Sequence, residues 1–368
     1  PSLSQAPEPP DCVALAVANH RLLNLLEEAG ACGVRAAVVF GDPTVGAGRA
    51  PELQDQIAAL ARKYGMIVCG PNAMGVYALH RNLVISGYPV DPSLTAGRIA
   101  LITASGTVFD ALSQNNRQVA FNYVVSCGNE AVLSAADYLY HAVSAPETEA
   151  VALYLETVRN PEGFVEALQL AREKEIPIVA CKVGLSARGQ MLAQAHTGAL
   201  AGNAETYEAL FRHYGVAQVH SLDEMMDTLE LMSQVRRVNG NRVAALMESG
   251  GERSLVADLS QNLNIEFAKF DERTTTRLRS IVDDGVQPDN PLDAFGSGHD
   301  VERVYTECLE AMDQNSSTSL LLLAVDLVRD SYLSPLYVEA ALAALPRLTK
   351  PLAAMVNLSA GANTELMA

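Results

Sequence analysis

The sequence predicts an α/β protein built from successive doubly wound parallel sheets. Short apolar segments alternate with longer helical segments along the chain, and this alternation is typical of parallel strands joined by crossover helices. The apolar segments are hydrophobic without interruption, which indicates sheets that are covered on both faces. Several of them end in loops rich in Gly, Ser and Asn, as expected where strands give way to turns.

Residues 1–95 form the first predicted domain, which opens with a polar, proline-rich segment at residues 1–11. The expected elements are strands at residues 12–18, 35–40 and 66–69 and helices at residues 21–30 and 51–64. No glycine-rich dinucleotide fingerprint accompanies these strands. We therefore expect a domain whose first βαβ unit is missing.

Residues 96–238 form the second predicted domain, which ends in a polar linker around residues 236–241. The expected strands cover residues 99–103, 121–126, 151–155, 177–182 and 216–219. The expected helices cover residues 108–116, 131–143, 204–214 and 222–235. This order of elements again predicts a parallel sheet with helices on its faces.

Residues 239–368 form the third predicted domain, of the same alternating kind. The expected elements are strands at residues 242–247, 265–269, 319–325 and 351–356, a helix at residues 255–262 and a turn at residues 290–293. The sequence stops soon after the last strand, so we expect this domain to be incomplete as well.

The composition excludes some classes of partner. Hydrophobic residues make up 49% of the 368 residues and charged residues 19%, as in ordinary folded proteins. A net charge of −17 and the absence of Trp argue against a nucleic-acid partner, which requires basic side chains and favours aromatic stacking. An anionic small ligand is still compatible with this charge, because backbone amides and helix N-termini bind phosphate locally.

The lack of targeting signals and the spacing of the cysteines indicate a cytoplasmic protein. The chain has no apolar run of the roughly 20 residues that span a bilayer, and no secretory signal opens it. Its cysteines show the spacing of neither a metal site nor a disulfide framework. We expect them to be reduced: Cys12, Cys32, Cys69, Cys127, Cys181 and Cys308.

One histidine, His196, lies among very small residues in the segment 182–202. Its neighbours Thr197 and Gly198 leave the backbone free to approach a ligand, and the turn at Gly184 resembles an anion nest. We therefore expect an exposed histidine in a small-residue loop that faces a ligand. A packed or capping histidine is the alternative that the local sequence leaves open.

Two further loops follow predicted strands. Gly70, Pro71 and Asn72 come directly after the strand at residues 66–69, and loops at the carboxyl ends of parallel strands bind ligands in open α/β sheets. An ordinary turn is the alternative there. The segment Ser105-Gly106-Thr107 begins a predicted helix whose free N–H groups can hold a phosphate, with helix capping alone as the alternative.

Glu156 ends the apolar strand at residues 151–155. A carboxylate at the end of a strand can simply be solvated or can cap a neighbouring helix. If the sheet brings Glu156 near His196, the carboxylate can orient the ring and keep one of its nitrogens protonated.

The motifs, in chain order, closely resemble those of the NDP-forming (ADP-forming) acyl-CoA synthetases, relatives of the succinyl-CoA synthetase α subunit. They are GPNAMG, TASGT, SCGNE, LYLE, KVGLSARG, AHTGALAG, ESGGE and NPLD. The resemblance covers nearly the whole chain. It implies a partial Rossmann-like CoA-binding domain at residues 1–95, a ligase domain that carries a phosphohistidine at residues 96–238 and a second flavodoxin-like ligase domain at residues 239–368.

The resemblance also implies an activity: joining a small carboxylic acid to coenzyme A at the expense of a nucleoside triphosphate, through an acyl phosphate and a phosphohistidine. His196 is then the phosphorylated residue and Glu156 its carboxylate partner. The phosphate is expected between two helix N-termini, one at residues 105–107 and the other near His196. The implied phosphate-binding residues are Ser105, Gly106, Thr107, Thr197 and Gly198, and the implied coenzyme A-binding residues are Gly70, Pro71 and Asn72.

The chain offers no stretch with the Lys and Mg²⁺-binding carboxylates of an ATP-grasp domain. The resemblance therefore implies that ATP or GTP binds with Mg²⁺ on a partner domain or subunit, in an oligomer. The alternative function is a regulatory module that senses coenzyme A or acyl-CoA without turnover. A dinucleotide-dependent dehydrogenase is a weaker alternative, because the fingerprint that binds such a cofactor is missing.

Overall fold

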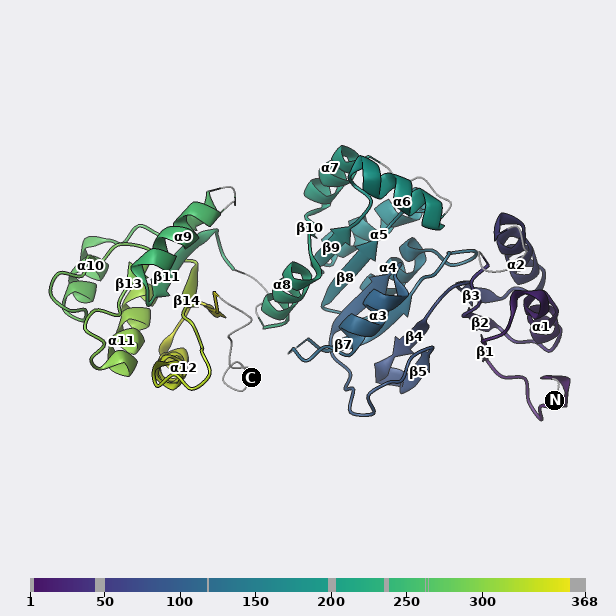
Figure 1. Ribbon diagram of the computed structural model, residues 1–368, viewed down its shortest axis with the longest axis horizontal. Helices are drawn as coiled ribbons and strands as arrows, with labels where there is room; N and C mark the ends of the chain where they lie inside the picture. Colours follow the sequence, from purple (N-terminus) through teal and green to yellow (C-terminus); the bar gives the residue numbers. More distant parts are fainter. Residues whose placement is uncertain are drawn as a thin grey trace. The chain divides into compact units, whose positions relative to one another are not determined.

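The computed structural model describes residues 3–43, 50–117, 119–197, 203–234, 238–261, 263 and 265–357, with only the backbone described at residues 4, 50, 51, 193–197 and 234. The chain divides into two compact units, Pro1–Gln234 and Val235–Ala368 (Figure 1). The described residues form three sheets, two of them in the first unit. The predicted domain boundaries at residues 95 and 238 stay predictions.

The first sheet has three parallel strands in the order β1-β2-β3. The strands are β1 (Cys12–Leu15), β2 (Ala36–Val39) and β3 (Ile67–Cys69), after a short 3-10 helix, η1 (Leu3–Gln5). The helices α1 (Asn19–Ala31) and α2 (Ala50–Tyr64) cross over between them. Leu22, Leu26 and Ile57 from these helices are fully buried against Val39 and Val68 of the strands.

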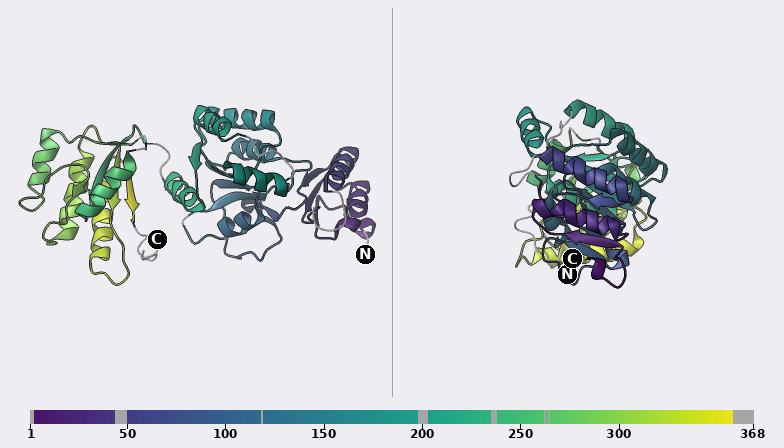
Figure 2. Two further views of the ribbon diagram at one scale, coloured as in Figure 1. Left: turned by 45° about the horizontal axis from the view of Figure 1, so that its top comes forward. Right: turned by 90° about the vertical axis from the view of Figure 1, so that its right-hand side faces the viewer.

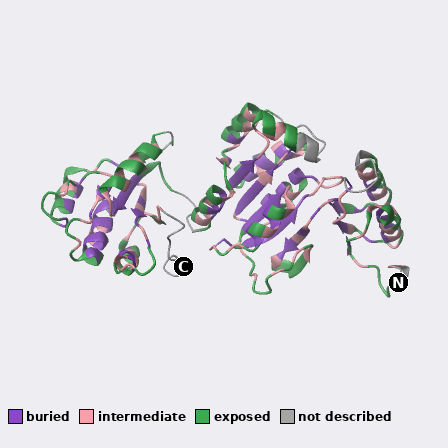
Figure 3. Ribbon diagram, viewed as in Figure 1, coloured by how far each residue is buried: buried purple, intermediate pink, exposed green. Residues whose placement is uncertain are grey.

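The second sheet has seven strands in the order β10-β9-β8-β6-β7-β4-β5. Its parallel strands are β6 (Ile99–Thr103), β7 (Phe121–Ser126), β8 (Ala150–Leu155), β9 (Ile178–Lys182) and β10 (Ala217–Val219). The strands β4 (Gly75–Ala78) and β5 (Leu83–Ser86) add an antiparallel hairpin, joined by the 3-10 helix η2 (Leu79–Arg81). Nearly every residue of the parallel strands is buried (Figure 3).

Helices lie on both sides of the second sheet (Figure 2). One face packs against α4 (Ala135–Ser144), α5 (Pro161–Glu173) and α7 (Ala204–Tyr214). The other face packs against α3 (Gly106–Ser113) and α8 (Leu222–Gln234). The helix α6 (Ala187–Thr197) follows β9. The predicted doubly wound parallel architecture is therefore confirmed.

The third sheet lies in the second unit and has the order β12-β11-β14-β15, with β13 paired to β11. The strands are β11 (Arg242–Met247), β12 (Glu266–Phe267), β13 (Leu292–Asp293), β14 (Leu320–Ala324) and β15 (Leu352–Met355). The helices are α9 (Gly250–Ser260), α10 (Glu272–Arg279), α11 (Val301–Asp313) and α12 (Leu333–Ala344), followed by the 3-10 helix η3 (Leu345–Arg347). All the pairings of this sheet are parallel.

Some local predictions were wrong. The hairpin β4–β5 was not predicted, and the turn expected at residues 290–293 contains the strand β13, which pairs with β11. The helix expected from residue 131 begins only at Ala135, because Ser134 and Asp137 form a capping box there. All six cysteines are free, as predicted. Among the helices of the described ranges, none combines the length and the hydrophobicity that a bilayer span requires.

Candidate functional site

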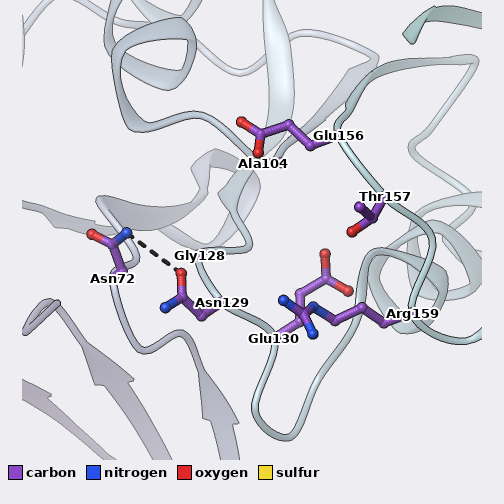
Figure 4. A pocket seen from close by; sticks show the side chains of 8 residues that line it. All are labelled: Asn72, Ala104, Gly128, Asn129, Glu130, Glu156, Thr157 and Arg159. Carbon is purple, nitrogen blue, oxygen red and sulfur yellow. Dashed lines mark hydrogen bonds between the residues drawn. The ribbon is translucent and has the colours of Figure 1, made fainter. Parts of the chain in front are cut away.

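A pocket lies in the first unit where loops from both of its sheets meet. It opens at the carboxyl ends of β3, β6, β7 and β8 (Figure 4). The residues that line it are Asn72, Ala104, Gly128, Asn129, Glu130, Glu156, Thr157 and Arg159. Such a position, outside the carboxyl ends of parallel strands, is the usual place for a ligand in an α/β fold.

Two loops that belong to different sheets bond directly to each other at this pocket. The Asn129 N–H donates to the Pro71 carbonyl oxygen at 2.7 Å, and the Ala131 N–H donates to the Gly70 carbonyl oxygen at 3.0 Å. The side chains of Asn72 and Asn129 are also linked, with 3.4 Å between Asn72 Nδ2 and Asn129 Oδ1 (Figure 4). The predicted coenzyme A loop is therefore fixed to the loop that follows β7.

The helix α3 begins beside the pocket, two residues after Ala104. Ser105 caps it, since Ser105 Oγ accepts a hydrogen bond from the Val108 N–H at 3.4 Å. Thr103 Oγ1 accepts from the Ser105 N–H at 3.0 Å, and Ser105 Oγ lies 3.1 Å from Thr107 Oγ1. The capping role is thus present, and phosphate binding at residues 105–107 stays a prediction.

Glu130 and Arg159 were not among the predicted site residues. Glu130 adopts a left-handed backbone conformation, with φ 54°, and its Oε2 accepts from the Ala135 N–H at 3.2 Å. Burial raises the pKa of Glu130 to about 7, an effect that the nearby Arg159 guanidinium opposes. In Figure 4 the Arg159 side chain extends across the pocket toward Glu130. A carboxyl group that titrates near neutral pH therefore faces the pocket.

Asn129, Thr157, Ala104 and Gly128 are the other lining residues that were not among the predicted site residues. Asn129 and Glu130 belong to the turn after the strand at residues 121–126, and Thr157 and Arg159 follow Glu156 within three residues. Their place after strand ends was the available signal. The direction of their side chains could not be predicted, because a sequence does not show which residues of a turn face inward.

The structure changes the setting of His196. The segment was predicted to be a loop, but residues 187–197 form α6, and His196 lies in its last turn. Ala, Gln, Met and Leu favour a helix there. The helix end beside His196 is thus a C-terminus, not the N-terminus that was predicted there, and the next helix N-terminus among the described residues is that of α7 at Ala204. The side chains of His196 and Thr197, and all of Gly198, lie outside the described residues.

Two predicted residues therefore share the pocket: Asn72 from the coenzyme A loop and Glu156 at the end of β8. Gly70 and Pro71 lie in the loop that carries Asn72, and Gly106 opens the helix that begins beside Ala104. The Glu156 carboxylate points into the hollow in Figure 4. The distance between Glu156 and His196 stays untested, because the imidazole is outside the described part of the chain.

Comparisons with known proteins agree with this architecture. A CoA-binding domain model matches residues 1–78, and a model of the flavodoxin domain of succinyl-CoA ligase matches residues 96–232. The ADP-forming acetate–CoA ligase of Methanocaldococcus jannaschii is 31% identical over 78% of this chain and 40% of its own length. The α subunit of ADP-forming acetate–CoA ligase II of Pyrococcus furiosus is 30% identical over 85% of this chain and 68% of its own length.

A solved structure shows the same fold. It is acetyl-coenzyme A synthetase 1 of Candidatus Korarchaeum cryptofilum, in complex with phosphate and ADP, and it superposes with a TM-score of 0.84 at 24% identity over 97% of this chain and 76% of that one. The chain spans less than half of the M. jannaschii relative and about two thirds of the P. furiosus subunit. From the domain matches and these relatives, the chain belongs to the NDP-forming (ADP-forming) acyl-CoA synthetases, the relatives of the succinyl-CoA synthetase α subunit.

Proposed function

We propose that this chain supplies the acid- and coenzyme A-handling part of an NDP-forming acyl-CoA synthetase. It joins a small carboxylic acid to coenzyme A through an acyl phosphate and a phosphohistidine at His196. The nucleotide chemistry, with ATP or GTP and Mg²⁺, takes place on an ATP-grasp domain or subunit outside this chain. The observation that carries the proposal is the shared pocket, where Asn72 of the coenzyme A loop and Glu156 meet beside the start of α3.

The reaction needs two transfers at this pocket. A carboxylate oxygen of the acid attacks the phosphorus of phosphohistidine, so that a P–O bond forms, the N–P bond breaks and the electron pair returns to the imidazole. The thiolate of coenzyme A then attacks the acyl carbon, and inorganic phosphate leaves as the acyl C–O bond breaks. Both steps handle a phosphoryl group with nearly two negative charges, which requires donors aimed at its oxygens.

The chain has the groups that these steps require. The Val108 N–H of α3 is taken by the Ser105 cap, and we assign the N–H groups of Gly106 and Thr107 to the phosphate oxygens, where the helix dipole favours an anion. Each such preorganised donor contributes about 3 kcal/mol to a transition state, by analogy with oxyanion-hole substitutions. Glu156 supports the proposed acceptor by holding one imidazole nitrogen protonated, which leaves the other nitrogen as the nucleophile.

Phosphoryl labelling tests the proposal. The full chain, incubated with the ATP-grasp partner, ATP and Mg²⁺, is expected to form a phosphoprotein that is labile in acid and stable in base. Acetyl phosphate is expected to label the chain without the partner, because the acyl phosphate donates directly to His196. His196→Ala removes the label in both reactions, whereas His213→Ala, an exposed histidine of α7, retains it.

Equal labelling of wild type and His196→Ala overturns the proposed function. Coenzyme A binding measured by calorimetry, with no label from either phosphoryl donor, supports the sensing module instead. A panel of carboxylic acids tested with the complete assembly identifies the substrate.

A further inference from the structure

Lys182 is a buried lysine directly behind the pocket. It is the last residue of β9, and only 4% of its surface is exposed. Burial lowers the pKa of Lys182 to about 8, although the nearby Glu156 carboxylate acts in the opposite direction. Lys182 does not line the pocket. Burying an ammonium group costs free energy unless its N–H groups are hydrogen-bonded. The hydrogen bonds of Lys182 therefore show which part of the structure it stabilises.

Those contacts converge on the loop that carries Glu156. Lys182 Nζ donates to the backbone carbonyl oxygen of Glu156 at 2.8 Å, and it donates also to the carbonyl oxygen of Val183. Leu155 pairs with Lys182 in the sheet, so the ammonium reaches the β8 loop at the first peptide beyond the strand. Hydrogen bonds from a charged donor are stronger than neutral ones, and this one fixes the Glu156 peptide.

The same ammonium group contacts the helix that follows the His196 segment. Lys182 Nζ lies 4.7 Å from the centroid of the Tyr207 ring in α7. The Tyr207 hydroxyl group in turn hydrogen-bonds the backbone of Val158, two residues beyond Glu156. Lys182 and Tyr207 therefore bind the segment 156–158 at two backbone positions, Glu156 and Val158, and connect it to α7.

We propose that Lys182 is the positioning residue for Glu156. Its ammonium group anchors the Glu156 peptide and so sets the direction in which the Glu156 carboxylate enters the pocket. The contact with Tyr207 ties this loop to α7, which begins seven residues after Thr197, the residue next to His196. The inference rests on the proposed function, in which Glu156 is the partner of His196.

The test measures the rate of phosphohistidine formation in the full assembly with ATP and Mg²⁺. Lys182→Met is expected to slow labelling by about 10- to 100-fold, the loss typical of residues that orient a reactive group. The KM for coenzyme A is expected to stay within about twofold, because the Asn72 loop is anchored elsewhere. Lys174→Met is the matched control: Lys174 Nζ also donates to two backbone carbonyl oxygens, of Val143 and Ser144, at 3.0 and 3.2 Å, but outside the pocket.

A double-mutant cycle distinguishes positioning from general stabilisation. If Lys182 acts through Glu156, the double variant Lys182→Met, Glu156→Gln labels no more slowly than Glu156→Gln alone. If the rate losses of the two single variants multiply in the double variant, the inference is overturned. A Lys182→Met protein that labels at the wild-type rate overturns it as well. If circular dichroism shows that Lys182→Met does not fold, Lys182→Gln, which also removes the ammonium group but keeps a polar side chain, replaces it in the cycle with the same expected outcome. An unlabelled wild-type chain overturns the proposed function and this inference together.

Discussion

Replacing Gly128 with alanine should force apart the two loops that build the pocket. Gly128 has φ +61°, and a Cβ atom there would lie 2.2 Å from the carbonyl oxygen of Pro71 and 2.8 Å from the backbone nitrogen of Ala73. These are backbone atoms, which cannot rotate away as the end of a side chain can. The loop at residues 70–73 must therefore move, and with it the hydrogen bond from the Asn129 N–H to Pro71.

The expected cost is the sum of three effects. The left-handed conformation costs an alanine about 1 kcal/mol, the clash costs about 1–3 kcal/mol as overpacking, and the weakened hydrogen bond costs about 1 kcal/mol. Gly215 is the matched control, because it has φ +72° at the end of α7 but no atom within 4 Å of its would-be Cβ. Gly215→Ala should therefore cost only the first of these, about 1 kcal/mol.

Urea unfolding followed by circular dichroism measures both free energies, since the chain has no Trp for fluorescence. Gly128→Ala should lose about 3–5 kcal/mol of unfolding free energy, from the sum above. Calorimetry should also show weaker coenzyme A binding for Gly128→Ala and unchanged binding for Gly215→Ala. Equal destabilisation by the two substitutions would refute the reasoning, because it would mean that the contact between the loops contributes nothing.

Three further substitutions have defined outcomes. Glu130→Gln should raise the unfolding free energy by about 3 kcal/mol above pH 7, because burial raises the pKa of Glu130 from 4.5 to about 7 and makes its ionisation costly in the folded state. The gain should vanish toward pH 4.5, where the wild-type carboxyl group is protonated in the folded protein, and urea titrations at several pH values measure it. Asn290→Ala should cost about 3 kcal/mol in thermal unfolding, because its amide accepts from the Ala245 N–H and donates to two carbonyl oxygens, at 2.8–2.9 Å. Ser105→Ala should lose about 1 kcal/mol as the cap of α3 and should also slow phosphohistidine labelling, whereas a pure capping role would leave the labelling rate unchanged.

The sequence predicted the central strands well because their signal is local. The strands β6, β7 and β11 were predicted residue for residue, since each is an apolar run bounded by polar or turn residues. The hairpin β4–β5 carries no such signal: its strands are four residues long, and Leu83 and Val84 are exposed. Its stability comes from pairing with β7, over 40 residues away in sequence, which a local pattern does not show.

The same distinction applies to the candidate site. Asn72 follows a strand end, where ligands bind in α/β folds, whereas the role of Glu156 was predicted from the family resemblance, and both residues line the pocket. Glu130 was missed because the helix was expected to begin next to it, at residue 131, whereas the helix starts four residues later and Glu130 has a left-handed backbone in the turn before it. The segment around His196 was predicted as a loop from its small residues, although Ala at several positions also favours a helix.

The charges that line the pocket constrain how an anionic intermediate can be held there. Among the described lining residues, Glu130 and Glu156 carry carboxyl groups and Arg159 the guanidinium. With both acids ionised, the side chains alone would repel a phosphoryl group. Burial lets Glu130 take up a proton near pH 7, which removes one of the two opposing charges. The remaining attraction must then come from Arg159 and from uncharged donors, such as the first N–H groups of α3 and the side-chain amides. Phosphate affinity of the chain should accordingly weaken as the pH rises through 7 in the wild type relative to Glu130→Gln, which keeps only the pH dependence that comes from the ionisation of phosphate itself.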